Sequence, residues 1–372
     1  MIVIDGVIWQ SEGFFRSYTV DQSQIWLSLI AEWLTSKKST ELVILTRGQT
    51  WLPPGTFFTE IPRFSFEEVE EDRVGLQSIC DQLKAKLFIS TGYTTPLSTP
   101  SVAFVYDLEV ERGSQFQSEY LEKKNSLLNA VHYVCFSDVI KVGLQEYYPG
   151  IPSDHISVVY PAIGSWARPA SANLTAEFRR KYKLTRPFFL AVIPEQIVDY
   201  RGIQALSQAW ELMQGQKLSR TELVFAFPSS VNVDPAKAQM PQANGLHYLS
   251  LTNAELACAY SASLALIAHD TFRAESALEA MACGCPVVSY RDDRSGTKQS
   301  HLRSSETLAS TLLCQGSLQE LAEALVQIQT YQVRTPLISK GLERAKGFSW
   351  PVMAEQLWEI FEQVTAEQHL AV

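Results

Sequence analysis

The chain of 372 residues has no apolar run close to the roughly 18–20 residues that a bilayer-spanning helix needs. It also has no basic segment before its first apolar stretch, MIVIDGVIWQ, which is therefore expected to be a strand rather than a signal peptide. No Walker loop, GxGxxG fingerprint or nucleophile elbow is present. These absences argue against an ATPase, a dinucleotide-dependent dehydrogenase and a serine hydrolase, and they favour a cytoplasmic protein.

Cysteine and histidine are sparse and scattered. Cys283 and Cys285 are the closest pair among the 6 cysteines, and no histidine follows them at zinc-finger spacing. The 6 histidines form no metal-ligand spacing, and His269 is the one closest to an expected ligand site. We therefore expect buried, reduced thiols and no bound metal.

Charged residues make up only 19% of the sequence, and the net charge of −9 is unevenly distributed. Residues 1–165 contain 12 basic and 20 acidic residues, whereas residues 166–372 contain 19 and 20. An acidic surface repels polyanions. Nucleic acid is therefore excluded as a partner, and peripheral contact is the most that a membrane would make.

Short apolar runs alternate with amphipathic stretches along the whole chain, which is the pattern of a doubly wound α/β protein. The length favours two domains. Strands are predicted at 2–5, 41–46, 86–90, 102–106, 132–137 and 156–160, and then at 187–193, 222–227, 246–251, 264–269 and 286–290. A segment rich in proline, glycine and alanine at 161–172 is the expected linker, so that the domains span 1–165 and 166–349.

Several segments resemble glycosyltransferase family 4. The strongest is LEAMACGCPVVSY (278–290), which is similar to a signature of that family, and 88–111, 249–269 and 337–350 resemble further segments in the same order. The resemblance implies a GT-B fold, in which two Rossmann-like domains face a cleft and the last helix, 350–368, crosses back to the first domain. It also implies that the first domain binds the acceptor and the second a nucleotide sugar.

The resemblance assigns roles to several residues. It implies that Glu279 binds the ribose hydroxyls of the nucleotide and that Ser276 belongs to the donor site. Tyr106 and Asp107 match a pair that lies near the donor sugar, and Gly6 matches a glycine near the acceptor. For Asp107 the alternative is that it caps a loop or helix.

Three positions depart from the family pattern. Thr271 stands where the family has a second glutamate, and Glu195 stands where it has a phosphate-binding arginine. Arg201 occupies the place of the family's lysine and would still bind phosphate well. Arg273 either replaces the lost arginine or forms an exposed surface pair of little energetic value.

Two functions remain open. The first is a metal-independent, retaining transferase that moves a hexose from a UDP- or GDP-sugar to a glycan or lipid-linked acceptor in polysaccharide or glycoconjugate biosynthesis. The second is a GT-B protein that has lost transfer activity and acts as a binding subunit beside another glycosyltransferase or a second copy of itself. The altered residues Glu195 and Thr271 motivate the second hypothesis.

Overall fold

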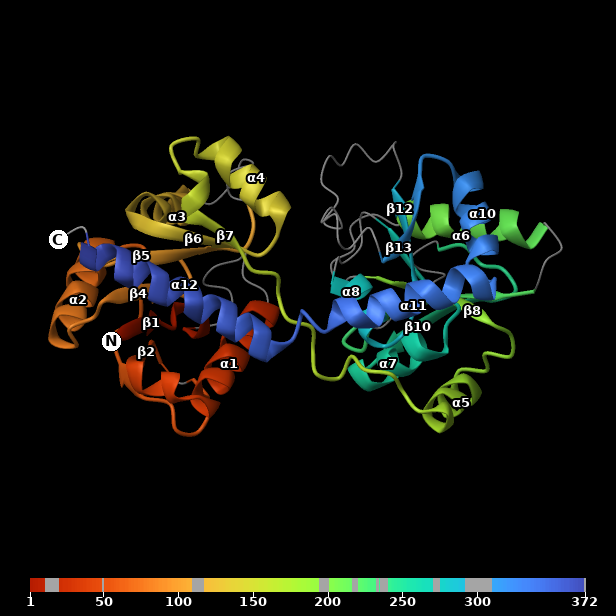
Figure 1. Cartoon of the computed structure of the whole chain (residues 1–372), viewed down its shortest axis with the longest axis horizontal. Helices are drawn as coiled ribbons and strands as arrows, with labels where there is room; N and C mark the ends of the chain where they lie inside the picture. Colours follow the sequence, from red (N-terminus) through yellow and green to blue (C-terminus); the bar gives the residue numbers. More distant parts are fainter. Residues whose placement is uncertain are drawn as a thin grey trace. The chain divides into compact units, whose positions relative to one another are not determined.

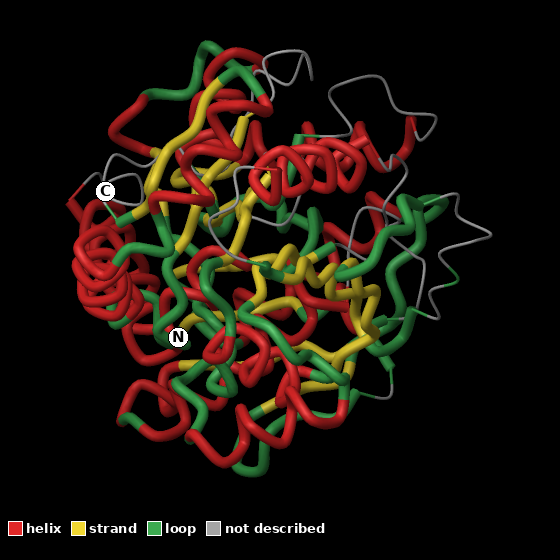
Figure 2. The backbone as a smooth tube through the Cα atoms, turned by 90° about the vertical axis from the view of Figure 1, so that its right-hand side faces the viewer, coloured by secondary structure: helices red, strands yellow, loops and turns green. Residues whose placement is uncertain are grey.

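The computed structural model describes residues 1–10, 20–48, 50–108, 117–193, 201–215, 220–231, 234, 240–269, 275–291 and 310–370. The chain forms two compact units (Figure 1). The first unit contains Met1–Ala162 and Trp350–Val372, and the second unit contains Ile163–Ser349. The strands lie among helices (Figure 2).

The sheet of the first unit has the order β3-β2-β1-β4-β5-β6-β7, and its neighbouring strands are parallel. A parallel sheet must be covered on both faces, so its strands, apart from the exposed edge strand β3, are rich in apolar residues. The strands are β1 (Ile2–Asp5), β2 (Leu42–Thr46), β3 (Phe58–Glu60), β4 (Leu87–Ser90), β5 (Ser101–Val105), β6 (Ala130–Cys135) and β7 (Ile156–Val158).

Successive side chains of this sheet point to opposite faces. Ile2 and Ile4 pack against α1 (Val20–Thr35) and α12 (Trp350–Leu370), whereas Val3 packs against α2 (Val69–Gln82). The face of α2 also carries α3 (Gln117–Asn129) and α4 (Asp138–Tyr147), whose apolar residues pack on β5 and β6.

Helix α12 belongs to the first unit although it follows the whole second unit in sequence (Figure 1). Leu357 and Phe361 of α12 are completely buried in the core against α1. The indole Nε1 of Trp33 donates a hydrogen bond of 3.0 Å to the carbonyl oxygen of Ala354. The C-terminal helix therefore completes one face of the first sheet.

The second unit has a sheet of parallel strands in the order β10-β9-β8-β11-β12-β13. Its strands are β8 (Phe188–Val192), β9 (Glu222–Pro228), β10 (Leu246–Leu251), β11 (Leu266–His269), β12 (Val287–Arg291) and β13 (Thr311–Gln315). Helices α6 (Arg201–Gly215) and α10 (Leu318–Gln327) pack on one face. The other face carries α5 (Ala172–Lys181), α7 (Asn253–Ala262), α8 (Glu275–Ala282) and α11 (Tyr331–Ala345).

The cysteines are free thiols, as the sequence predicted, and all but the half-buried Cys258 are buried. Burial raises the pKa of the Cys135 thiol to about 12 and that of Cys80 to about 11, so that they stay protonated. In the described part of the chain, no helix is long and apolar enough to cross a bilayer.

Candidate functional site

Each sheet contains one place where the connections leave neighbouring strands in opposite directions. In the first unit this switch point lies between β1 and β4, and in the second it lies between β8 and β11. The loops beyond the carboxyl ends of two such strands diverge and leave a crevice where ligands of open α/β sheets bind. Functional side chains are therefore expected at the carboxyl ends of these strands.

At the switch point of the second unit, two helices begin on opposite faces of the sheet. Helix α6 starts at Arg201 after β8, and α8 starts at Glu275 after β11. Arg201 is exposed at the first position of its helix, whereas Ser276 is buried in the first turn of α8. Both helix N-termini present backbone N–H groups and a positive dipole end to this edge, an environment that favours anions.

Glu279 lies in the second turn of α8 and is half-buried. The hydroxyl of Tyr260, a completely buried residue of α7, donates a hydrogen bond of 3.2 Å to Glu279 Oε2. Burial, together with the negative charge of Glu279, raises the pKa of Tyr260 well above its usual value. Because Tyr260 keeps its proton, it acts as a donor that fixes the orientation of the carboxylate.

Three residues predicted for this site lie outside the described residues. Glu195 falls within 194–200, and Thr271 and Arg273 fall within 270–274. The exchange of a phosphate-binding cation between these two loops therefore stays a prediction. His269, which precedes the second of the loops, is buried at the end of β11 with its ring 5.5 Å from that of Tyr290.

In the first unit, Tyr106 is a core residue. The indole Nε1 of Trp26 donates a hydrogen bond of 2.6 Å to the Tyr106 hydroxyl, which in turn donates one of 3.3 Å to the carbonyl oxygen of Thr91. Burial raises the pKa of Tyr106. Tyr106 thus ties α1 to the end of β4, and its hydroxyl is engaged inside the protein.

Asp107 directly follows Tyr106 at the carboxyl edge of the sheet and keeps about 24% of its side chain exposed. The ammonium group of Lys123, which is completely buried, donates a hydrogen bond of 2.8 Å to the carbonyl oxygen of Asp107. The same ammonium lies 3.9 Å from Asp107 Oδ1. Lys123 therefore holds the backbone of Asp107 in place and partly balances its charge.

Gly6 lies at the same edge, at the start of the short helix η1 (Val7–Trp9). A Cβ atom at Gly6 would lie 2.4 Å from the ring of Trp9 and 2.9 Å from the carbonyl oxygen of Leu45. The group that approaches Gly6 closely is thus the protein's own Trp9. This close packing explains the glycine without a ligand.

The charged network at the β1–β4 switch point is a feature that the sequence analysis missed. Arg47 Nε and Nη2 donate hydrogen bonds of 2.8 and 2.7 Å to the two carboxylate oxygens of Asp5, and both side chains are completely buried. Arg47 Nη1 also donates a bond of 2.6 Å to Asp72 Oδ1. Thr94 Oγ1 donates one of 2.5 Å to Asp5 Oδ2.

This network gives Asp5, at the carboxyl end of β1, hydrogen-bond partners inside the protein. Burial raises the pKa of Asp72, while Arg47 opposes that rise. The signal for the network was present in the sequence, because Asp5 and Arg47 directly end or follow two apolar strands, IVID and LVILT. A charged residue at that place has to find a partner across neighbouring strands.

Among the described residues, no group of three or more His, Cys, Asp or Glu side chains is arranged to hold a metal ion. At the β8–β11 switch point the described residues offer hydrogen bonds, fixed charges and helix dipoles. The carboxylate of Glu279 and the N-termini of α6 and α8 form the arrangement best suited to a ligand with both hydroxyl and phosphate groups.

No protein-family model and no curated protein matches the chain. Solved structures do match over nearly its whole length. A sucrose-phosphate synthase from Thermosynechococcus elongatus superimposes with a TM-score of 0.64 at 15% identity, covering 98% of this chain and 99% of its own. A glycosyltransferase from Rickettsia africae gives 0.65 at 14% identity, with 98% of each chain covered.

A third match is HepE from Anabaena, solved in complex with UDP-glucose. It superimposes with a TM-score of 0.64 at 14% identity and covers 97% of this chain and 99% of its own. Likeness at this level of identity shows the fold, and the prediction of a GT-B fold is confirmed. Function has to be inferred from the sequence and from the residues of the site, because one fold supports many functions.

Proposed function

We propose that this protein is a family 4 glycosyltransferase that transfers a hexose from a UDP- or GDP-sugar to a glycan or lipid-linked acceptor. The observation that carries the proposal is the Tyr260-oriented carboxylate of Glu279 at the β8–β11 switch point. A solved protein of the same fold, HepE, binds UDP-glucose.

The chemistry of a nucleotide sugar fits the groups at this edge. A carboxylate accepts hydrogen bonds from two neighbouring hydroxyls, which is what a ribose presents to Glu279. A diphosphate is stabilised by a guanidinium and by helix N-termini, which Arg201, α6 and α8 supply. These groups would lower the barrier by stabilising the departing diphosphate, in a reaction that needs no metal.

Calorimetric titration with UDP, GDP and their glucose derivatives tests the donor site. Arg201→Ala should weaken nucleotide binding by about 2–4 kcal/mol, because a charge-assisted contact is lost. Glu279→Gln should also weaken it, through loss of the charged acceptor. Arg180→Ala is the matched control, since Arg180 is an exposed residue at the end of α5.

The proposal fails if none of the nucleotides or nucleotide sugars produces heat at about 1 mM, a concentration that detects binding as weak as about −4 kcal/mol. It also fails if Arg201→Ala and Arg180→Ala bind nucleotide equally well. Such a result would remove the N-terminus of α6 from the donor site.

One observation favours the alternative, a binding subunit without transfer activity. Asp5 at the carboxyl end of β1 is engaged by Arg47 and Thr94, and Trp9 packs tightly on Gly6 beside it. Under this hypothesis the protein is a binding or scaffold subunit beside another glycosyltransferase, and it neither transfers nor hydrolyses a sugar. Turnover of UDP-glucose or GDP-glucose by the purified protein would reject it.

A further inference from the structure

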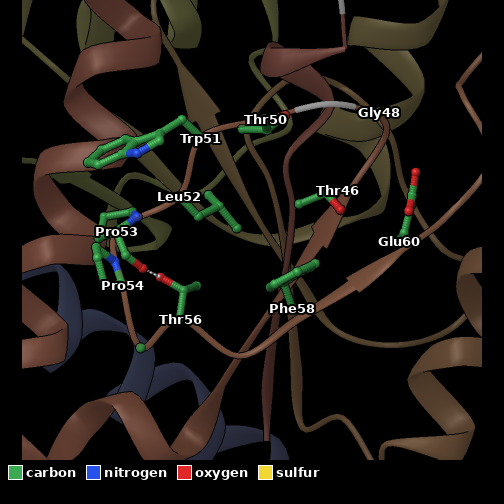
Figure 3. A pocket seen from close by; sticks show the side chains of 11 residues that line it. Thr46, Gly48, Thr50, Trp51, Leu52, Pro53, Pro54, Thr56, Phe58 and Glu60 are labelled. Carbon is green, nitrogen blue, oxygen red and sulfur yellow. Dashed lines mark hydrogen bonds between the residues drawn. The ribbon is translucent and has the colours of Figure 1, made fainter.

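A pocket of about 460 Å³ lies at the edge of the first sheet, next to β3 and the loop that joins β2 to β3. Its wall contains the aromatic rings of Trp51 and Phe58, two prolines, three threonines and Glu60. Figure 3 shows Trp51 and the prolines on one side and Phe58 and Glu60 on the other. Among the described residues, no lysine, arginine or histidine lines it.

The aromatic walls are unusually open to solvent. Trp51 is 72% exposed and Phe58 is 61% exposed, and the neighbouring Phe57 is 64% exposed. Burying such rings would contribute favourable free energy, so a cluster of exposed aromatic side chains usually marks a binding surface. These rings do not serve to fill the hydrophobic core, because all three residues of β3 are exposed.

The loop that carries these rings is held in a fixed shape. Gly48 and Gly55 adopt positive φ angles of 128° and 93°, which side chains rarely tolerate. The hydroxyl of Thr56 donates a hydrogen bond of 2.6 Å to the carbonyl oxygen of Pro53, drawn as the dashed line in Figure 3. A wall with two adjacent prolines loses little conformational freedom when a ligand binds.

We propose that this pocket binds a sugar ring of a neutral saccharide. The apolar C–H face of a pyranose packs on an aromatic ring, as Trp51 and Phe58 allow, while its hydroxyls find acceptors and donors in Glu60 and the threonines. The single carboxylate and the lack of a cation disfavour a phosphorylated ligand. Saccharide binding to this pocket does not depend on the proposed function. The role of that saccharide as the acceptor of a transfer reaction does rest on the proposed function.

Saturation-transfer NMR on the full chain, with maltose, cellobiose and lactose as probes and without nucleotide, tests the proposal. We expect transfer to the ring protons of at least one disaccharide. Trp51→Ala should weaken this binding about tenfold, the change that loss of one stacked ring produces.

Phe57→Ala is the matched control, since this exposed aromatic residue does not line the pocket. It should bind the disaccharide as the parent does. Glucose 6-phosphate and choline serve as the anionic and cationic probes, and both should bind more weakly than the disaccharide.

Three outcomes overturn the proposal: no transfer to any disaccharide at about 10 mM, equal binding by Trp51→Ala and Phe57→Ala, or preference for choline. Titration of the same variants with UDP and GDP keeps this test separate from that of the donor site. Saccharide binding with no binding of either nucleotide would support the pocket and reject the proposed function. Nucleotide binding with no saccharide binding would reject the pocket and leave the proposed function in place.

Discussion

Arg47 lies between two carboxylates in the interior of the first unit. Its guanidinium binds Asp5, which is completely buried, and Asp72, whose side chain is 14% exposed. Removing one partner of a buried ion pair leaves an uncompensated charge in a poorly solvated place. Arg47→Ala should therefore lower the free energy of unfolding of the first unit by about 3–5 kcal/mol, as measured by urea denaturation.

Arg73→Ala is the control for that change. Arg73 pairs with Glu70 at 3.3 Å on α2, where 19% of the Arg73 side chain and 74% of the Glu70 side chain are exposed. A pair with one solvated partner contributes about 0–1 kcal/mol. Equal effects of the two substitutions would show that the buried network does not stabilise the fold.

His132 should make the first unit sensitive to mild acid. Burial lowers its pKa below the ordinary value of 6.5, and its ring lies 2.9 Å from the hydroxyl of Ser157. The unfolded chain then binds a proton more readily than the folded one, so stability is present above pH 6.5 and is lost as the pH falls through the folded pKa.

We therefore expect the unfolding free energy of the parent to fall more steeply between about pH 7.5 and pH 5.5 than that of His132→Gln. His155→Gln, which alters an exposed histidine nearby, should follow the parent. Parallel profiles for the parent and His132→Gln would contradict this role.

At the scale of single elements, strands with strong apolar character were predictable and weak ones were not. The completely buried strands β1 and β8 coincide closely with the predicted ranges 2–5 and 187–193. Strand β3 was missed because its three residues are exposed and carry no apolar pattern. Helix α11 contains Pro336, a residue that usually ends a helix, so sequence reasoning did not predict this helix.

Some residues of the candidate sites were also predictable from the sequence, and others were not. The prediction for Glu279 came from the resemblance of 278–290 to a family signature, and the structure shows that Tyr260 donates a hydrogen bond to its carboxylate. The link between Asp5, Arg47 and Asp72 joins residues far apart in sequence. It depends on strand order and register, which a single sequence does not contain.

Helix α12 stabilises the first unit through its apolar face. Phe361 is completely buried, with its ring 5.9 Å from that of Trp33. Phe361→Ala should lower the free energy of unfolding by about 3–5 kcal/mol, because the transfer energy is lost and a cavity remains. Glu359→Ala, on the exposed side of the same helix, should change it by less than about 0.5 kcal/mol. Similar denaturation midpoints for the two variants would refute this role of α12.

At the scale of the whole molecule, the second unit is a continuous segment and the first is not. Residues 163–349 have their own core on both faces of their sheet. We expect this fragment to unfold cooperatively by itself, as followed by circular dichroism. Residues 1–162 alone should fail to fold, because α12 would be missing from their core.

A fusion of 1–162 to 350–370 through a short glycine-serine linker is the control for that experiment. The Ala162 backbone N–H lies 3.4 Å from Met353 Sδ, and the Ile163 N–H donates a hydrogen bond of 2.8 Å to the carbonyl oxygen of Phe348. The chain at residue 162 therefore lies close enough to the start of α12 for a short linker to join them. A soluble, cooperatively folding 1–162 fragment without α12 would contradict the requirement for the helix.

The late position of α12 in the chain has a consequence for biosynthesis. A ribosome completes residues 163–349 before it synthesises Trp350–Leu370, so the second unit can fold first although its sequence begins later. Until the last helix emerges, the apolar surface that will receive Leu357 and Phe361 stays uncovered. A premature stop just before codon 350 would thus leave a nascent chain with one finished unit and one that chaperones must bind.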